Sequence, residues 1–282
     1  MDQLPNIEVS EICKELGELP PKNISQIYGG SIHLSYRLDF QSYSLFLKKN
    51  IRKEKFLKYE CFCLKDLEQY IDEKNLIIPK INTYINFDKT ELLLIQWIEM
   101  NNRSHSRLGK GLAEMHLQSN QSNPKKFGYG LEGYIGSNKQ IAGWDNNWIN
   151  CFLNFRISPQ LKKLKNNALD ANIIRDLISK IKIILNDHIP LLTLVHGDLW
   201  SGNIGINEDG KGVIFDPASW WADSEVDIAM SMLFGGFKEE FYKEYFKVIP
   251  KKEGFNKRAT IYNFYHILNH ANMFGGSYLT EV

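Results

Sequence analysis

Strict alternation of apolar and polar residues marks the N-terminal third of the chain. Between residues 34 and 40 every second side chain is apolar, which predicts a strand with one buried face. A turn at Gln41-Ser42 and a returning strand over residues 43–48 complete a hairpin. Apolar runs at residues 77–81 and 92–97 predict two more strands. We therefore expect an antiparallel sheet in this part of the chain.

Apolar residues spaced three and four apart predict helices beside and after these strands. A short helix is expected to start from a cap at Ser10 and to end at Gly17, and a longer one to cover residues 54–70. From residue 99 onward the helical pattern dominates. We place the boundary between two lobes there, with strand-rich residues 1–98 before it and mainly helical residues 99–282 after it.

Two segments of the second lobe depart from the helical pattern. Over residues 127–148 glycines interleave with aromatic residues, and so long a glycine-rich segment predicts a functional loop. Packing of those aromatics onto their own lobe explains them equally well. Residues 219–225 are predicted to form an exposed turn before a helix that buries Val226 and Leu233.

One segment carries the residue types that phosphoryl transfer requires. An apolar run leads into His196-Gly-Asp198-Leu-Trp200-Ser-Gly-Asn203, and a second apolar run ends on Asp216. Protein kinases place a catalytic Asp five residues before a metal-binding Asn, and another metal-binding Asp at a later strand end. By this spacing Asp198 is the expected base, and Asn203 and Asp216 the expected ligands of Mg²⁺ on ATP. The alternative is that Asp198 and Asn203 only cap turns.

Residues upstream are predicted to complete a nucleotide-binding site. A Gly29-Gly30-Ser31 turn precedes the first hairpin, as in loops that lie over phosphates, although it also suits a plain β-turn. Lys48 emerges from an apolar strand, and Glu60 in the following helix is placed to pair with it. Each charge alone would be read as a solvated surface residue. Gln96-Trp97-Ile98 is the expected hinge, whose backbone would contact adenine.

A buried carboxylate is predicted to support the catalytic turn. Asp227 falls next to the apolar face of a helix, where its charge is costly unless it accepts hydrogen bonds. The amides of the turn at His196 are its best donors. His116, at the end of another apolar helix face, is expected to be a core or helix-end residue.

Composition narrows the class of protein. The 282 residues (32.7 kDa) suit one large domain or two lobes, and 43% apolar with 24% charged residues is ordinary globular material. A net charge of +1 gives no case for nucleic acid or an anionic membrane as partner. Neither a transmembrane run nor a signal peptide is visible. The four cysteines are scattered, so we expect a reducing cytoplasm.

These motifs together resemble the fructosamine kinase (ketosamine-3-kinase) family over essentially the whole chain. The resemblance rests on His196-Gly-Asp-Leu-Trp-Ser-Gly-Asn203, Phe215-Asp-Pro-Ala218, Glu225-Val-Asp227 and Leu233-Phe-Gly-Gly-Phe237. It implies an α+β, bilobal, protein-kinase-like fold of the aminoglycoside phosphotransferase type. The small N-lobe would hold an antiparallel sheet and one main helix, and the larger C-lobe would be mostly helical. It also implies ATP-dependent phosphorylation of the sugar C3 hydroxyl of ketosamines, free or protein-bound, as a repair of glycation.

The resemblance assigns a role to each predicted site residue. Asp198 would be the base, Asn203 and Asp216 the metal ligands, and Lys48 with Glu60 the phosphate clamp. The Gly29-Gly30-Ser31 turn and the Gln96–Ile98 hinge would complete the ATP site, with His196 and Asp227 as structural support. Trp200, Trp220 and Trp221 are the candidate walls of the acceptor site, although Trp200 would equally suit a core residue bracing the turn.

The chain also departs from the family pattern. Many members have Asn where this chain has His33, some have Cys at the position of Ser31, and an Arg is common at the position of Ser224. Three other functions stay open. The first is a kinase for aminoglycosides, amino sugars or choline-like alcohols, and the second is a nucleotide-binding module without activity. The third, a metal hydrolase using His196 and Asp198, lacks a further histidine cluster.

Overall fold

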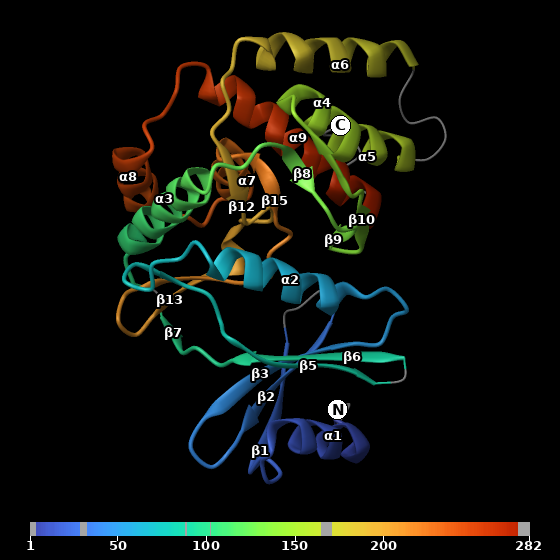
Figure 1. The fold of residues 1–282 in the computed structure, drawn as a ribbon, viewed down its shortest axis with the longest axis vertical. Helices are drawn as coiled ribbons and strands as arrows, with labels where there is room; N and C mark the ends of the chain where they lie inside the picture. Colours follow the sequence, from blue (N-terminus) through green and yellow to red (C-terminus); the bar gives the residue numbers. More distant parts are fainter. Residues whose placement is uncertain (1–3, 29–32, 88, 102, 165–170, 276–282) are drawn as a thin grey trace.

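The computed structural model describes residues 4–28, 33–87, 89–101, 103–164 and 171–275. The Gly29-Gly30-Ser31 turn lies outside these residues. The chain folds into two lobes, a small one built on a sheet and a larger one made mainly of helices (Figure 1). The helix α2 (Phe56–Glu68) lies between the small-lobe sheet and the large lobe.

A five-stranded sheet forms the small lobe. Its order is β1-β2-β3-β6-β5 and every pairing is antiparallel, which confirms the sheet predicted from the alternation. The strands are β1 (Asn23–Ile27), β2 (Leu34–Asp39), β3 (Ser44–Asn50), β5 (Ile81–Phe87) and β6 (Thr90–Gln96).

Helices cover both faces of this sheet. Leu92 and Leu94 of β6 pack in the cluster that contains α1 (Asn6–Leu16), whereas Leu93 packs in the cluster that contains α2. Successive residues of a strand point to opposite faces. Because both faces are buried, β6 is a continuous apolar run and not an alternating one.

The large lobe packs its helices around one extended core. Among the described residues, no helix is both long and apolar enough to cross a lipid bilayer. The helical segments are α3 (Ser106–Gln121), α4 (Trp148–Phe152), a π-helical turn η1 (Leu153–Ile157), α5 (Ser158–Lys163), α6 (Ala171–Asn186), a 3-10 turn η2 (Ser201–Asn203), α7 (Glu225–Leu233), α8 (Glu239–Val248) and α9 (Phe255–Phe274).

Short strands position the loops that carry the predicted catalytic residues. One sheet has the order β11-β8-β15-β12, a second the order β4-β14-β13-β7, and β9 pairs with β10. Strand β4 comes from the part of the chain before residue 98, whereas β14 comes from the large lobe. Because these two strands pair, backbone hydrogen bonds connect the two parts. The strands are β4 (Leu76–Ile77), β7 (Met100–Asn101), β8 (Phe127–Tyr129), β9 (Gly133–Ile135), β10 (Asn138–Gln140), β11 (Gly143–Asp145), β12 (Leu192–Val195), β13 (Ile204–Asn207), β14 (Gly212–Ile214) and β15 (Trp220–Asp223).

Two predicted boundaries of the small lobe are wrong. The first helix begins at Asn6, so Ser10 lies inside it, although the helix ends beside Gly17 as predicted, with that glycine in the left-handed conformation. The strand predicted over residues 77–81 is the end of β4 and the start of β5. Pro79 separates them, because it has no amide N–H for a ladder.

Two predicted loops of the large lobe are also wrong. Residues 127–148 form the four short strands β8 to β11 and the start of α4. Most of their aromatic side chains are buried, although Trp144 is 45% exposed. Residues 220–223 form strand β15, which pairs with β12 and β8 and is buried except for the half-buried Trp221.

Candidate active site

The turn at His196-Gly197-Asp198, predicted to be catalytic, is held by the side chain of Asp227, as predicted from the sequence. The two carboxylate oxygens of Asp227 accept the backbone N–H groups of His196 at 2.7 Å and Gly197 at 2.8 Å. His116 approaches the same carboxylate at 3.2 Å, and its other ring nitrogen lies 2.8 Å from the Tyr245 hydroxyl. Burial alone would raise the pKa of Asp227, but these hydrogen bonds lower it below the ordinary value. A fully buried anion therefore anchors the turn.

Gly197 is required at the centre of this turn. Its φ of 83° is in the left-handed region, and a Cβ there would lie 2.2 Å from the carbonyl oxygen of Ala218. The carbonyl of His196 accepts the N–H of Ala218 at 2.9 Å. The turn is thereby packed directly against the segment that follows Asp216.

The His196 side chain links the two acid-bearing segments. Its Nε2 lies 2.9 Å from the Phe215 carbonyl, which can only accept, so Nε2 carries the proton. Its Nδ1 then accepts the backbone N–H of Asp198 at 3.3 Å. Burial lowers the pKa of His196, which favours this neutral form. A neutral imidazole in this position fixes the backbone before Asp198 relative to the backbone before Asp216.

Asp198 and Asn203 contact each other directly. The Asn203 amide nitrogen donates to the Asp198 carbonyl at 2.9 Å and to its carboxylate at 3.2 Å. Burial, together with the negative charge of Asp216, raises the pKa of Asp198 to about 7, although the Asn203 hydrogen bond opposes the shift. A carboxylate with this pKa can take up a proton near neutral pH.

Lys48 joins the two lobes at the same point. Its ammonium group donates to Glu60 of α2 at 2.6 Å and also contacts the carboxylate of Asp216. Burial opposes the charge of Lys48, but the two acids raise its pKa above the ordinary value. Asp216 itself has a φ of 58°, which is strained for a residue with a side chain. Such strain is typical of functional positions.

The donor set at this point suits Mg²⁺. Asp216 offers carboxylate oxygens, and the amide nitrogen of Asn203 is already bonded to Asp198, which leaves its amide oxygen for a ligand. Mg²⁺ prefers oxygen ligands and is usually held by one or two protein groups plus phosphates. Asn203 and Asp216 therefore fit the metal that the spacing predicts.

The predicted hinge has most of its amide donors in use. Gln96 N–H donates to the Lys80 carbonyl at 2.8 Å, and Trp97 N–H donates to the Ser44 carbonyl at 3.3 Å. Within the part of the chain that the structure describes, the N–H of Ile98 has no such bond. The Trp97 ring lies under the guanidinium of Arg37, 4.5 Å from the ring centre.

The three tryptophans predicted as acceptor walls have different environments. Trp200 follows the catalytic turn and is 38% exposed, with the edge of its ring toward Phe234. Trp220 is fully buried and stacks on Trp148, so it cannot line an open site, and that prediction is wrong. Trp221 is half-buried and packs edge-on against Tyr70 of the small lobe. The two side chains of the Trp-Trp pair point to opposite faces because they lie on a strand.

The profile of the fructosamine kinase family matches residues 7–282 of this sequence. The chain belongs to this family. A protein from Vibrio parahaemolyticus named "Probable ketoamine kinase" is 35% identical over 91% of this chain and 88% of its own length. A protein from Arabidopsis thaliana named "Protein-ribulosamine 3-kinase, chloroplastic" is 33% identical over 90% of this chain and 78% of its own length.

Solved structures agree with the fructosamine kinase assignment. A crystal structure from Haemophilus somnus 129PT, named provisionally as a fructosamine-3-kinase, has a TM-score of 0.84 at 25% identity, over 97% of this chain and 93% of that one. An aminoglycoside phosphotransferase has a TM-score of 0.65 at 13% identity, over 97% and 92% of the two chains. The bilobal, protein-kinase-like α+β fold predicted from the motifs is confirmed.

His33 is a residue near the candidate site that is not predicted from the sequence. His33, noted only as a departure from the family pattern, lies 5.7 Å from the ring of Phe56, and its Nδ1 is buried without a partner among the described residues. Burial and the positive charge of Lys48 together lower the pKa of His33 to about 4. No local sequence signal indicates this placement, because Lys48 and Phe56 come from other elements.

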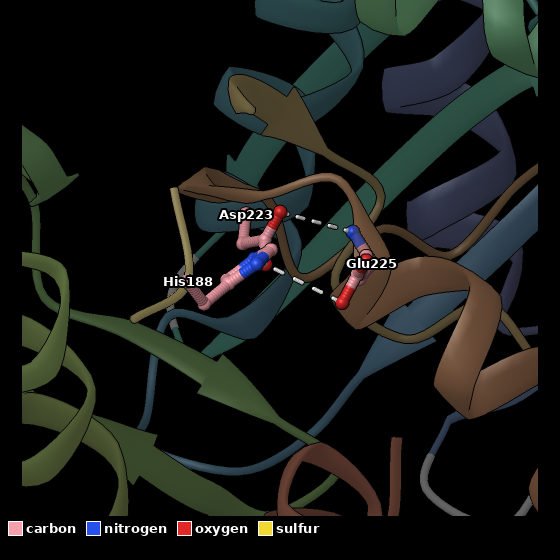
Figure 2. Close-up of side chains that lie close together, drawn as sticks. All are labelled: His188, Asp223 and Glu225. Carbon is pink, nitrogen blue, oxygen red and sulfur yellow. Dashed lines mark hydrogen bonds and ion pairs between the residues drawn. The ribbon is translucent and has the colours of Figure 1, made fainter. Parts of the chain in front are cut away.

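A second cluster of metal-ligating residue types lies at the junction of α6, β15 and α7. Figure 2 shows His188, Asp223 and Glu225 pointing toward one another. His188 Nε2 is 2.6 Å from the Asp223 carboxylate, which also accepts the Tyr262 hydroxyl at 2.7 Å. Arg258 donates to both oxygens of Glu225, at 2.6 and 2.8 Å. The protein's own donors thus satisfy these carboxylates, and the cluster is a structural hydrogen-bond network.

Proposed function

We propose that this protein is an ATP- and Mg²⁺-dependent kinase that phosphorylates the C3 hydroxyl of the sugar in ketosamines, as a repair of glycated amines. The observation that carries the proposal is the convergence of Lys48 from the small lobe with Asp216 and the paired Asp198 and Asn203 from the large lobe. The family match and the names of the ketoamine and ribulosamine kinases support the acceptor class.

Each residue of the site then has a chemical task. Asp198 accepts the proton of the attacking hydroxyl, and its raised pKa suits that transfer. Asn203 and Asp216 would hold the metal, which would supply positive charge to neutralise the phosphates. Lys48, oriented by Glu60, contacts the phosphates as a fixed positive charge. His196 and Asp227 keep the turn rigid, so that the hydroxyl meets Asp198 in one orientation.

Several predicted features stay proposals. We propose that the Gly29-Gly30-Ser31 turn faces the phosphates, that Gln96, Trp97 and Ile98 contact adenine, and that the lobes divide after residue 98. Trp200 is the stronger candidate for an acceptor wall, because its exposed ring adjoins the turn that carries Asp198.

The setting and partners also stay proposals. A cytoplasmic setting is supported by four free, buried cysteines, although the relative from Arabidopsis thaliana has a chloroplastic name. The acceptor is a small or protein-bound ketosamine. No role for nucleic acid or a membrane is proposed.

A direct assay tests the reaction. The purified protein is incubated with Mg-ATP and synthetic fructosyl-lysine or ribulosyl-lysine, and the phosphorylated carbon is identified by NMR. Asp198→Asn is expected to lower kcat/KM by roughly 10³-fold while nucleotide binding is kept. Comparable turnover by this variant would remove Asp198 from the role of base.

The choice of acceptor separates the remaining alternatives. Phosphorylation of aminoglycosides, amino sugars or choline in preference to both lysine adducts would assign the protein to another class of small-molecule kinase. Mg²⁺-dependent nucleotide binding without turnover on any of these acceptors would indicate an inactive module. We expect turnover on ketosamines to exceed that on the other acceptors.

A further inference from the structure

Helix α2 contacts both lobes through two neighbouring side chains. The helix runs between the small-lobe sheet and the strands β9 and β10 of the large lobe (Figure 1). Glu60 bonds to Lys48 in the small lobe, whereas Tyr59 reaches into the large lobe. Consecutive helix residues point about 100° apart, so a single turn of α2 serves both contacts.

Tyr59 is fitted closely into the large lobe. Its side chain is buried, and its hydroxyl donates to the Ser219 carbonyl at 2.9 Å, with Gln140 Oε1 as a second acceptor at 3.2 Å. A Cβ on Gly133 would lie 2.1 Å from the Tyr59 ring, so β9 runs directly against it. Burial raises the pKa of Tyr59 well above its ordinary value, which keeps the hydroxyl a donor.

The contacts of Tyr59 close a ring around the predicted phosphate site. Tyr59 bonds to Ser219, which follows Asp216 by three residues in the chain. Asp216 contacts Lys48, and Lys48 bonds to Glu60. Glu60 is the neighbour of Tyr59 in α2, which closes the ring. We propose that Tyr59 is a positioning residue, which holds Glu60 and through it Lys48 at a fixed place relative to Asp216. This inference rests on the proposed kinase function.

The ring matters because Lys48 has two acidic partners. The buried ammonium needs a counter-charge, and both Glu60 and Asp216 offer one. If α2 moved away, Lys48 would keep only Asp216, and that carboxylate would be less available to Mg²⁺. With Tyr59 in place, Glu60 stays beside Lys48 and shares its charge. The carboxylate of Asp216 would then remain available as a ligand of Mg²⁺.

Other contacts hold α2 on the large lobe without touching Glu60. The Tyr129 hydroxyl donates to Asp66 near the C-terminal end of the helix, and Phe56 packs edge-on against Tyr134 at its start, with ring centres 4.4 Å apart. Removal of the Tyr59 hydroxyl therefore loosens the turn that carries Glu60 and leaves the rest of the helix attached.

Two variants test the proposal from opposite sides of the contact. Tyr59→Phe removes only the hydroxyl, and Gly133→Ala pushes a methyl group against the ring from β9. The affinity for AMP-PNP with MgCl₂ is measured by calorimetry in the full-length protein, after circular dichroism has shown native folding. Loss of one buried hydrogen bond corresponds to roughly a five- to tenfold weaker Kd. The matched control is Tyr242→Phe. The Tyr242 hydroxyl also donates to a backbone carbonyl, that of Ser231. Its removal should leave Kd unchanged.

A double-mutant cycle with Glu60→Gln separates positioning from general destabilisation. If Tyr59 acts through Glu60, Tyr59→Phe should change Kd less than about twofold in the Glu60→Gln background. The proposal would be overturned if Tyr59→Phe weakened Kd by the same factor in the wild-type and Glu60→Gln backgrounds. It would also be overturned if Tyr59→Phe alone left Kd unchanged.

The binding assay needs no acceptor, so the two hypotheses can fail separately. Nucleotide binding without turnover on ketosamines would refute the proposed acceptor and leave the role of Tyr59 measurable. A wild-type protein that binds no AMP-PNP would refute both.

Discussion

Asp198 combines reactivity with a cost in folding stability. Its pKa of about 7 in the folded protein lies above the ordinary 3.8. Below pH 3.8 the carboxyl is neutral in both states. Between pH 4 and 7 the folded state retains the proton that the unfolded state loses, so this group's contribution to stability falls as pH rises. Above pH 7 the full penalty applies, and only there is Asp198, the proposed base, fully ionised.

We therefore predict opposite pH effects on activity and on stability. The kcat/KM of the wild-type protein should rise with pH and level off above about 7. Asp198→Asn should raise the free energy of unfolding at pH 8 by about 1 to 3 kcal/mol, since it removes a partly buried charge. Chemical denaturation at pH 8 and pH 5 measures this difference, which should shrink at the lower pH. A variant less stable than wild type at pH 8 would contradict the prediction.

Gly197 offers a second prediction for a single residue. Gly197→Ala places a methyl group 2.2 Å from the Ala218 carbonyl at a φ of 83°. We expect a loss of about 2 to 4 kcal/mol in the free energy of unfolding, and loss of most activity, because the turn carries Asp198. Gly210→Ala is the matched control: its φ of 78° is similar, but nothing lies within 4 Å of the added Cβ. Equal effects in both variants would show that backbone strain alone, and not the close approach, is responsible.

Among the elements, β15, α7 and α9 are joined by charged groups. Arg258 of α9 is buried and donates to both oxygens of Glu225 at the start of α7. Arg258→Met should lower the free energy of unfolding by about 3 to 5 kcal/mol, since it leaves a buried carboxylate without its partner. The double variant Arg258→Met with Glu225→Gln should recover part of this loss in thermal unfolding. No recovery would indicate that the arginine acts through packing.

Elements with a strong local pattern could be predicted, and elements fixed by distant contacts could not. The alternation over β2 and the apolar run of β6 follow from which sheet faces are buried. The sequence predicts an exposed turn where strand β15 lies. Trp220 packs against Trp148 and Trp221 against Tyr70, and these partners are too far away in the sequence to leave a local pattern. Strands of three residues, such as β8 and β9, are too short to show a period.

The site shows the same division. The proximity of Asp198, Asn203 and Asp216, and the pairing of Lys48 with Glu60, could be predicted because phosphoryl transfer, the reaction expected from the sequence, restricts both residue type and order. The hydrogen bond from Tyr59 to Ser219 spans 160 residues and leaves no mark in either segment. Contacts that orient a site are therefore harder to predict from sequence than the groups that act in it.

For the whole molecule, the proposed nucleotide site combines residues from both lobes. Lys48 lies on β3 of the small lobe, while Asp216 follows β14 of the large lobe, and the two side chains contact each other. A ligand held by both residues would have to be released before either lobe unfolds. Binding should therefore stabilise the molecule as one unit, and not one lobe alone.

We predict that Mg-ATP stabilises the protein and that the metal-dependent part of the effect requires Asp216. At a ligand concentration 100 times Kd, binding raises the free energy of unfolding by about 2.7 kcal/mol. In a protein of this size, this raises the melting temperature by several degrees. Differential scanning calorimetry should show a single transition that moves upward as a whole. Asp216→Asn should lose the increment between ATP with EDTA and ATP with MgCl₂, whereas Asp209→Asn, in the turn between β13 and β14, should keep it. If the increment survives in Asp216→Asn, or if only one of two transitions moves, Asp216 does not hold the metal between the lobes.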